Sequence, residues 1–322
     1  MKKQLFLFEA LFFIILLVFS SGHLFSQKFS ADEEWVCRLL AKGKIDQALE
    51  TLEKEIVPAY PRNLNFLLFL GIAHYLQGDT EKAHKEFKKV DDELSDKRVS
   101  SRAPHGTSSF LLESSTDMSQ SYAALSEQNN GLLNFCYGLT LKDKNNIKNA
   151  EKKFQQARKY RYDQTSLSLQ LFDLYLAAHN LESASQELAQ LKQALGDNPT
   201  ITLLEGCLLY HKGQIDDSLA AFEKVKDSVS EAGLNMGLIQ YNRGDYQKAL
   251  DIWTGILATA PGDKEALLHA GQACTQLGNK EKAREYFEKT GMTVPPEKYT
   301  PKTIPLSLGT IVREVKFQFP CR

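Results

Sequence analysis

The sequence of 322 residues is poor in cysteine and has no excess of charge of either sign. Its 5 cysteines include no Cys-x-x-Cys pair, which argues against both a zinc framework and a disulfide framework. The 39 basic residues are balanced by 40 acidic ones, so no basic field attracts nucleic acid. Hydrophobic residues at 43% and charged residues at 25% exclude collagen and a chain disordered over most of its length.

Motifs for catalysis are missing as well. The sequence contains no phosphate-binding GxxxxGK[ST] loop, no GxGxxG after a strand, no HExxH and no GxSxG. Its 7 histidines are scattered, and His74 and His84 are too far apart in sequence for metal-ligand spacing. Paired carboxylates such as Asp91 and Asp92 point apart on a helix. We therefore predict a protein that is not an enzyme, with no metal, no cofactor, no small-molecule substrate and no nucleic-acid partner.

The first 26 residues have the anatomy of an export segment. Two lysines precede an apolar run from Leu5 to Phe19, which only Glu9 interrupts, and small residues follow. This order is typical of a secretory signal peptide, with cleavage near Gly22 or Ser26. The alternative is an uncleaved N-terminal anchor, which would associate the chain with a membrane through residues 5–26. Both alternatives predict an exported chain in the periplasm or cell envelope.

A helix–turn–helix pattern repeats along most of the remaining chain. A small residue, followed four positions later by a bulky apolar one, recurs at positions 48, 83, 150, 184, 218, 249 and 283. Successive gaps are 35, 67, 34, 34, 31 and 34 residues, and the gap of 67 is close to two periods. Glycine on the preceding helix allows two antiparallel helices to approach closely. The residues predicted to pack the helix pairs are Gly71, Ala83, Phe87, Gly138, Ala150, Phe154, Ala184, Gly206, Phe222, Gly237, Ala249, Trp253, Gly271, Ala283 and Phe287.

This pattern resembles the tetratricopeptide repeat (TPR) family, whose period is 34 residues. The resemblance implies an all-α TPR-type α-solenoid, a right-handed superhelix of antiparallel helix pairs. Phe172 and Val36 depart from the glycine of the pattern. The predicted units are 29–62 and 64–97 (units 1–2, within 29–97), then 131–164, 165–198, 199–229, 230–263 and 264–297 (units 3–7, within 131–297).

Two segments interrupt or follow the repeats. Residues 98–130 are rich in serine and are predicted to form a flexible insertion, with a decayed repeat as the alternative. The tail from 298 to 322 contains Pro301 and Pro305, which disfavour helix, and residues 315–319 alternate as a strand does. We expect this short non-helical tail to cap the last helix or to add a strand to the sheet of a partner. Cys321, close to its end, is a candidate free or intermolecular thiol.

The resemblance also implies a partner-binding groove, lined by the first helix of each unit. The family's clamp for acidic C-terminal peptides is missing, because the ninth positions of the units lack its Lys and Asn. The groove would suit an apolar segment, and the alternative is that the same residues pack between neighbouring repeats. The residues assigned to the groove are Leu68, Ile72, Tyr75, Leu132, Phe135, Leu139, Leu169, Leu176, Leu203, Tyr210, Leu234, Leu238 and Tyr241.

The sequence therefore predicts a non-catalytic scaffold for protein–protein interaction in a bacterial-type cell envelope, with another protein of unknown identity as its partner. The alternative is an assembly or maintenance factor for envelope or outer-membrane complexes. In that role the C-terminal tail would supply an added strand.

Overall fold

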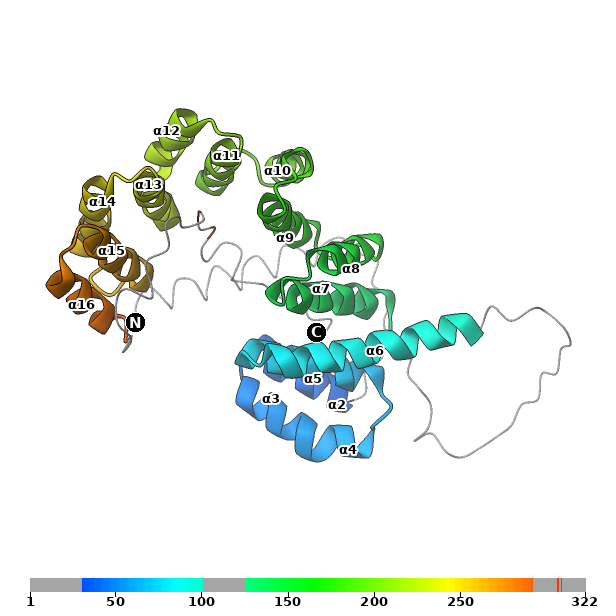
Figure 1. Ribbon diagram of the computed structural model, residues 1–322. Helices are drawn as coiled ribbons and strands as arrows, with labels where there is room; N and C mark the ends of the chain where they lie inside the picture. Colours follow the sequence, from blue (N-terminus) through cyan, green and yellow to red (C-terminus); the bar gives the residue numbers. More distant parts are fainter. Residues whose placement is uncertain (1–30, 101–124, 292–305, 307, 309–322) are drawn as a thin grey trace, which may run out of the picture.

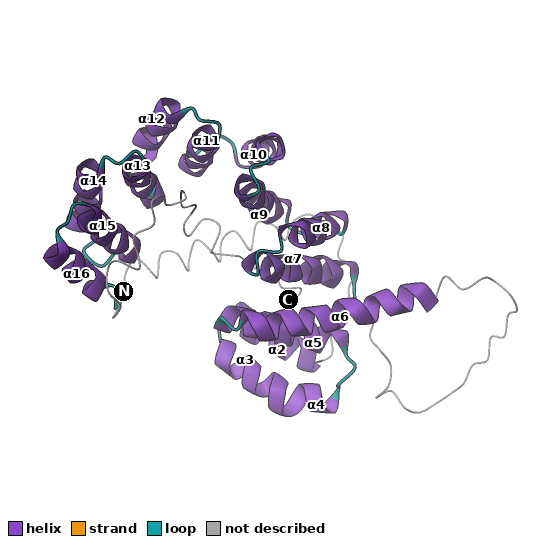
Figure 2. Cartoon of the chain, in the orientation of Figure 1, coloured by secondary structure: helices purple, strands orange, loops and turns teal. Residues whose placement is uncertain are grey.

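The computed structural model describes residues 31–100, 125–291, 306 and 308. Throughout this part of the chain the structure is helix and loop without a strand (Figure 2), which confirms the all-α prediction. The helices are α2 (Ala31–Ala41), α3 (Ile45–Thr51), the π-helical η1 (Leu52–Ile56), α4 (Val57–Ala59), α5 (Leu64–Gln77), α6 (Thr80–Ser100), α7 (Glu127–Asp143), α8 (Ile147–Lys159), α9 (Gln164–Ala177), α10 (Leu181–Leu195), α11 (Pro199–His211), α12 (Ile215–Val225), α13 (Ser230–Asn242), α14 (Tyr246–Thr259), α15 (Lys264–Gln276) and α16 (Lys280–Lys289).

These helices pair and stack into an arc. Figure 1 shows α7, α9, α11 and α13 along its inner side, with their partners α8, α10, α12 and α14 outside them. We call the first helix of each pair an inner helix; these are α2, α5, α7, α9, α11, α13 and α15. The surface of these helices that lies toward the hollow of the arc is called the inner face. A solenoid buries its apolar residues between neighbouring pairs, so its core runs along the whole arc.

Capping and turn residues fix where the helices begin and end. The Asn63 side chain accepts hydrogen bonds from the backbone N–H groups of Asn65 and Phe66, at the start of α5. Gly78 ends the same helix with φ of 94°, a left-handed conformation that glycine adopts without strain. The corresponding turn of the next pair has Asn145 with φ of 57°, since asparagine tolerates this region better than most residues.

Five glycines of the inner helices lie directly against an aromatic ring of the second helix. A Cβ atom on Gly71 would lie 2.5 Å from the ring of Phe87, and one on Gly237 would lie 2.3 Å from that of Trp253. The three remaining pairs join Gly138 to Phe154, Gly206 to Phe222 and Gly271 to Phe287. All five rings are at most 2% exposed. Glycine is therefore required here because the ring occupies the space that a side chain would fill.

The two units that depart from the glycine pattern have a larger side chain on the first helix and a smaller one than Phe or Trp on the second helix. Unit 165–198 places Phe172 at the glycine position and the smaller Leu188 at the aromatic position. Unit 29–62 places Val36 and Leu52 there. All four side chains are buried in one continuous cluster. A larger residue on the inner helix is thus accommodated by a smaller one opposite, which keeps the packed volume similar.

The serine-rich segment does not separate the first two units from the others. The described ends of 98–130 are helical, since α6 continues to Ser100 and α7 begins at Glu127. Asn129 Nδ2 donates to Asn65 Oδ1 at 2.7 Å, and Lys144 Nζ lies 2.5 Å from Glu81 Oε1. Because α7 stacks directly on α5 and α6, the gap of 67 residues holds no unit between them. Residues 101–124 lie outside the described part, so their own conformation remains a prediction.

The cysteines differ from the sequence prediction at one position. Cys136, Cys207 and Cys274 are buried free thiols, as expected of small apolar helix residues. Cys37, in α2, is disulfide-bonded, although the cysteine spacing in the sequence indicates no disulfide framework. The scattered cysteines gave no spacing signal, because a disulfide depends on proximity in space. Cys321 lies outside the described residues.

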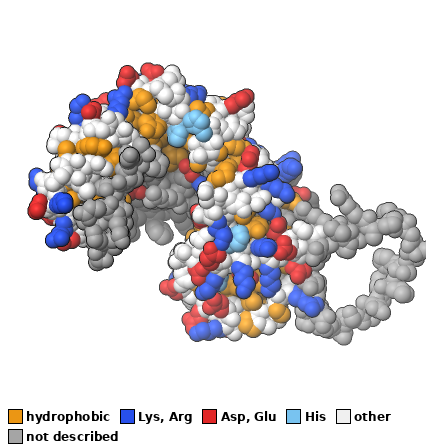
Figure 3. All heavy atoms as spheres, viewed as in Figure 1, with side chains coloured by type: hydrophobic (Ala, Val, Ile, Leu, Met, Phe, Trp, Pro, Cys, Tyr) orange, Lys and Arg blue, Asp and Glu red, His pale blue; other side chains and the backbone are white. Residues whose placement is uncertain are grey.

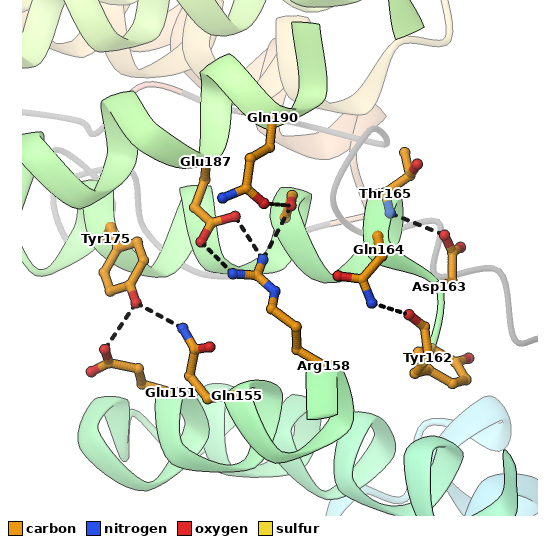
Figure 4. A network of polar contacts seen from close by, with 11 residues as sticks. Glu151, Gln155, Arg158, Tyr162, Asp163, Gln164, Thr165, Tyr175, Glu187 and Gln190 are labelled. Atoms are coloured by element: carbon orange, nitrogen blue, oxygen red, sulfur yellow. Dashed lines mark hydrogen bonds and ion pairs between the residues drawn. The ribbon is translucent and has the colours of Figure 1, made fainter. Parts of the chain in front are cut away.

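Polar contacts also join neighbouring units, and Figure 4 shows those around α9. Arg158, in α8, donates to both carboxylate oxygens of Glu187, in α10, at 3.0 and 2.7 Å. The Tyr175 hydroxyl donates to Glu151 at 2.9 Å. Burial is the main cause that raises the pKa of Tyr175 to about 12, and the hydrogen bond to Glu151 is the next largest cause. These bonds fix the angle between two units and hence the course of the inner face.

The surface is of mixed charge. Figure 3 shows acidic and basic side chains interspersed over the part of the molecule that contains α2 to α6, as the net charge of −1 leads one to expect. Among the described residues, no helix combines the length and the apolar character needed to cross a membrane. The proposed export segment at residues 1–26 lies outside the described residues.

Candidate partner-binding face

The structure separates the residues assigned to the groove into a buried and an accessible set. Three of them are partly exposed, namely Tyr75, Leu169 and Tyr210. The others are at most 5% exposed and pack inside the solenoid, namely Leu68, Ile72, Leu132, Phe135, Leu139, Leu176, Leu203, Leu234, Leu238 and Tyr241. Burial of this second set is expected both if these residues pack between neighbouring repeats and if a segment occupies the groove, so their assignment to the groove stays a prediction.

Hydrogen bonds between successive inner helices follow the repeat. The hydroxyl of Tyr210 accepts from Asn242 Nδ2 at 3.0 Å, and that of Tyr241 accepts from Gln276 Nε2 at 3.2 Å. At the corresponding position the Tyr75 hydroxyl donates to the Asp143 carboxylate. In each pair, residue 12 of one unit contacts residue 13 of the next. The inner face thus carries a row of polar cross-links at the C-terminal ends of its helices.

A charged contact takes the place of this bond between α7 and α9. Lys142, at position 12 of its unit, donates to Gln170 at 2.7 Å and lies 2.5 Å from the carboxylate of Asp173. The side chain of Lys142 is 18% exposed and that of Asp173 is 29% exposed. The inner face therefore combines partly exposed apolar residues with fixed polar groups.

Sequence reasoning did not identify Asp143, Lys142, Asn242 or Gln276 as inner-face residues. A signal for them exists, because polar residues recur at positions 12 and 13 of the units. That signal is visible only once the units are aligned, since each bond joins residues of two different units.

Burial shifts the pKa of several ionisable groups along the inner helices. Burial raises the pKa of Tyr75 and of Asp143, and it also raises the pKa of the Cys136 and Cys207 thiols. A thiol with a raised pKa is a poor nucleophile near neutral pH. In the described ranges, no group of three or more His, Cys, Asp or Glu side chains is placed to hold a metal ion.

Comparisons with known proteins agree with this architecture. A family model described as tetratricopeptide repeat matches residues 34–96 and 234–290. A solved tetratricopeptide repeat protein from Parabacteroides merdae superimposes with a TM-score of 0.60 at 14% identity, over 84% of this chain and 96% of that one. The Cut9–Hcn1 hetero-tetramer of the APC/C gives a TM-score of 0.51 at 11% identity, over 84% of this chain and 48% of that one.

A curated sequence relative matches a shorter stretch. The CTR9 homolog of Arabidopsis thaliana is 33% identical over 95 residues, which is 28% of this chain and 9% of that protein. The chain thus matches less than a tenth of this much longer relative. Together the comparisons show tetratricopeptide repeats at residues 34–96 and 234–290 and an all-α fold of this type.

Proposed function

We propose that this chain of tetratricopeptide repeats is a non-catalytic scaffold of a bacterial-type cell envelope, which binds a partner protein along its inner face. The observation that carries the proposal is the continuous row of inner helices from α5 to α15, which neighbouring units hold in register through cross-links such as Tyr210 with Asn242. Rigid helices present side chains at fixed spacing, and such a row offers an extended surface to another chain.

The accessible positions indicate the chemistry of the partner. Leu169 and Tyr210 are partly exposed, and each lies among polar groups already bonded within the solenoid. A partner segment with apolar side chains could bury them without leaving these polar groups unpaired. This favours an apolar or amphipathic segment over a highly charged one.

An affinity-capture experiment with two matched variants tests the binding face. Leu169→Glu places a charge on the inner face, whereas Leu195→Glu places the same charge on the outer helix α10, where Leu195 is already 46% exposed. The proposal expects the wild type and Leu195→Glu to retain the same envelope protein, and Leu169→Glu to retain at least about tenfold less of it. Equal retention by all three chains, or no specific retention by any, would contradict the proposal.

The envelope location rests on two independent features. Residues 1–26 have the order of an export segment, and Cys37 is disulfide-bonded, which is typical of oxidising compartments. Cell fractionation with N-terminal sequencing tests it. A new N-terminus near residue 22 or 26 indicates a cleaved signal, and an intact N-terminus in the membrane fraction indicates an anchor. An intact chain in the cytoplasm would contradict export.

A further inference from the structure

The inner helices are not equally accessible. Residues 64–74 of α5 and 131–141 of α7 are buried without exception, and eleven consecutive residues cover every side of a helix. In contrast, α9 keeps Leu169 and Asp173 partly exposed, and α11 keeps Thr202 and Tyr210 partly exposed. The second helices cover only the outer sides. Something therefore covers α5 and α7 from the hollow of the arc.

Two described residues of the C-terminal tail lie against the solenoid. Leu308 is 8% exposed and belongs to the cluster that runs from α2 to α13. Leu306 packs against this cluster and also against the one formed by α13, α14 and α15. Both clusters contain residues of α13, so Leu306 lies at this helix. The helices α12, α14 and α15 flank α13, which leaves the side of α13 toward the hollow of the arc for the tail. The second of these clusters also includes α15 residues and Tyr286 of α16, so the expected cap on the last helix stays a prediction.

A third observation lies at the opposite end of the arc. Cys37 of α2 is disulfide-bonded, and Cys136, Cys207 and Cys274 are free. The chain has 5 cysteines. The fifth, Cys321, is therefore the remaining partner within the chain.

We propose that the C-terminal segment of this chain occupies the inner face of its own solenoid, from Leu306 at α13 to a disulfide between Cys37 and Cys321 at α2. This inference rests on the proposed function of the inner face and names its occupant in the absence of a partner. The lengths agree. Cys321 follows Leu308 by thirteen residue steps, which span about 43–47 Å when extended. Five steps between neighbouring inner helices, at about 8–10 Å each, span about 40–50 Å.

The sequence of the segment suits such a site. Leu306 and Leu308 alternate with other residues, as do Val315, Phe317 and Phe319. In an extended chain alternate side chains point to one side, so Val315, Phe317 and Phe319 form one apolar edge, and Leu306 and Leu308 form another on the opposite side. Pro305 precedes the described residues and disfavours helix there. A partner of this face is accordingly an extended segment with an apolar residue at every second position.

The disulfide makes the occupant hard to displace. Its formation joins two thiols, and two electrons and two protons pass to a disulfide oxidant, which becomes a dithiol. A tethered segment has an effective concentration of about millimolar, so a competing segment at micromolar concentration binds only weakly. Reduction releases one end and lowers this barrier.

Peptide mapping of the oxidised full chain tests the covalent part without any variant. Protein digested under non-reducing conditions, with free thiols alkylated beforehand, is expected to yield a linked pair of peptides that contain Cys37 and Cys321. The pair separates on reduction. Alkylated Cys321, or a link from Cys321 to a second chain, would overturn the proposal.

Binding of a synthetic peptide tests the occupancy. The peptide has the sequence of residues 303–319, and the proteins are the oxidised wild type, the double variant Leu306→Asp with Leu308→Asp after reduction, and the control Leu277→Asp. Leu277 is 42% exposed in the loop after α15. We expect the double variant to bind the peptide at least about tenfold more tightly than the wild type and the control do. A peptide with Asp at positions 306 and 308 is expected not to bind.

The outcomes separate this inference from the proposed function. Equal binding to all three proteins, including no binding to any, would overturn the occupancy and would mean that another segment, such as the N-terminal one, covers α5 and α7. Partner capture that depends on Leu169 would still support the scaffold. Conversely, a mapped disulfide together with no partner capture would refute the scaffold alone.

Discussion

The contact between Gly206 and Phe222 gives the sharpest prediction about stability. An added Cβ atom would lie 2.6 Å from one ring carbon and 2.8 Å from the next, well inside the optimum of about 3.5–4.0 Å. The ring is fully buried, so it has little room to move. Overpacking of this kind costs about 1–3 kcal/mol, whereas alanine in place of glycine gains up to about 1 kcal/mol of helix propensity.

The matched control is Gly255 in α14, where an added Cβ atom meets nothing within 4 Å. Gly255→Ala is expected to stabilise the chain by about 0.5–1 kcal/mol. Gly206→Ala is then expected to be about 1–3 kcal/mol less stable than this control. Urea unfolding followed by circular dichroism at 222 nm measures the difference.

A second substitution tests the mechanism itself. Unit 165–198 combines Phe172 with the smaller Leu188, so Phe222→Leu should make room for the methyl group that Gly206→Ala adds. We expect the double variant to be less destabilised than the sum of the two single variants by about 0.5–2 kcal/mol. Equal stability of Gly206→Ala and Gly255→Ala, or strict additivity in the double variant, would refute the steric explanation.

Three further predictions concern contacts elsewhere in the solenoid. Arg158→Ala leaves the Glu187 carboxylate, whose side chain is 5% exposed, without its ion-pair partner and should cost about 3 kcal/mol in urea unfolding. Ser218 donates to the Gly206 carbonyl at 2.8 Å, but other units have alanine there, so Ser218→Ala should change stability by less than about 1 kcal/mol. Burial lowers the pKa of His269 below its ordinary 6.5. The buried neutral imidazole therefore contributes fully to the free energy of unfolding above pH 6.5, and this contribution is lost as the pH falls below that value. His269→Gln should flatten this dependence of the unfolding free energy between about pH 7.5 and 5.5.

Each of these predictions has an outcome that contradicts it. An Arg158→Ala variant as stable as the wild type would show that the ion pair only offsets its own desolvation. A large loss for Ser218→Ala would mean that the hydroxyl is needed in this unit. An unchanged pH profile for His269→Gln would assign the acid sensitivity to other groups.

Local sequence spacing was sufficient to predict the helix pairs. Glycine and an aromatic residue sixteen positions later, as in Gly71 and Phe87, are packed in one unit, so their relation is visible along the chain. The same holds for the turn at Gly78. These features depend on neighbours within about 34 residues, which a periodic pattern records.

Contacts between units were harder to predict. Tyr210 and Asn242 belong to different repeats, and the direct stacking of α7 on α5 and α6 spans a serine-rich segment that looks like a missing unit. The groove assignment does not distinguish the partly exposed Leu169 from the buried Leu203, because both are leucines on inner helices. The disulfide at Cys37 joins positions that no local pattern relates.

The most direct test of the scaffold is site-specific photo-crosslinking in intact cells. A photoreactive amino acid replaces Leu169 or Tyr210 on the inner face, or Leu195 on the outer helix as the control. We expect one crosslinked envelope protein that is shared by the two inner positions and absent from the outer one. The same product from Leu195, or none from Leu169 and Tyr210, would contradict the claim that this face binds the partner.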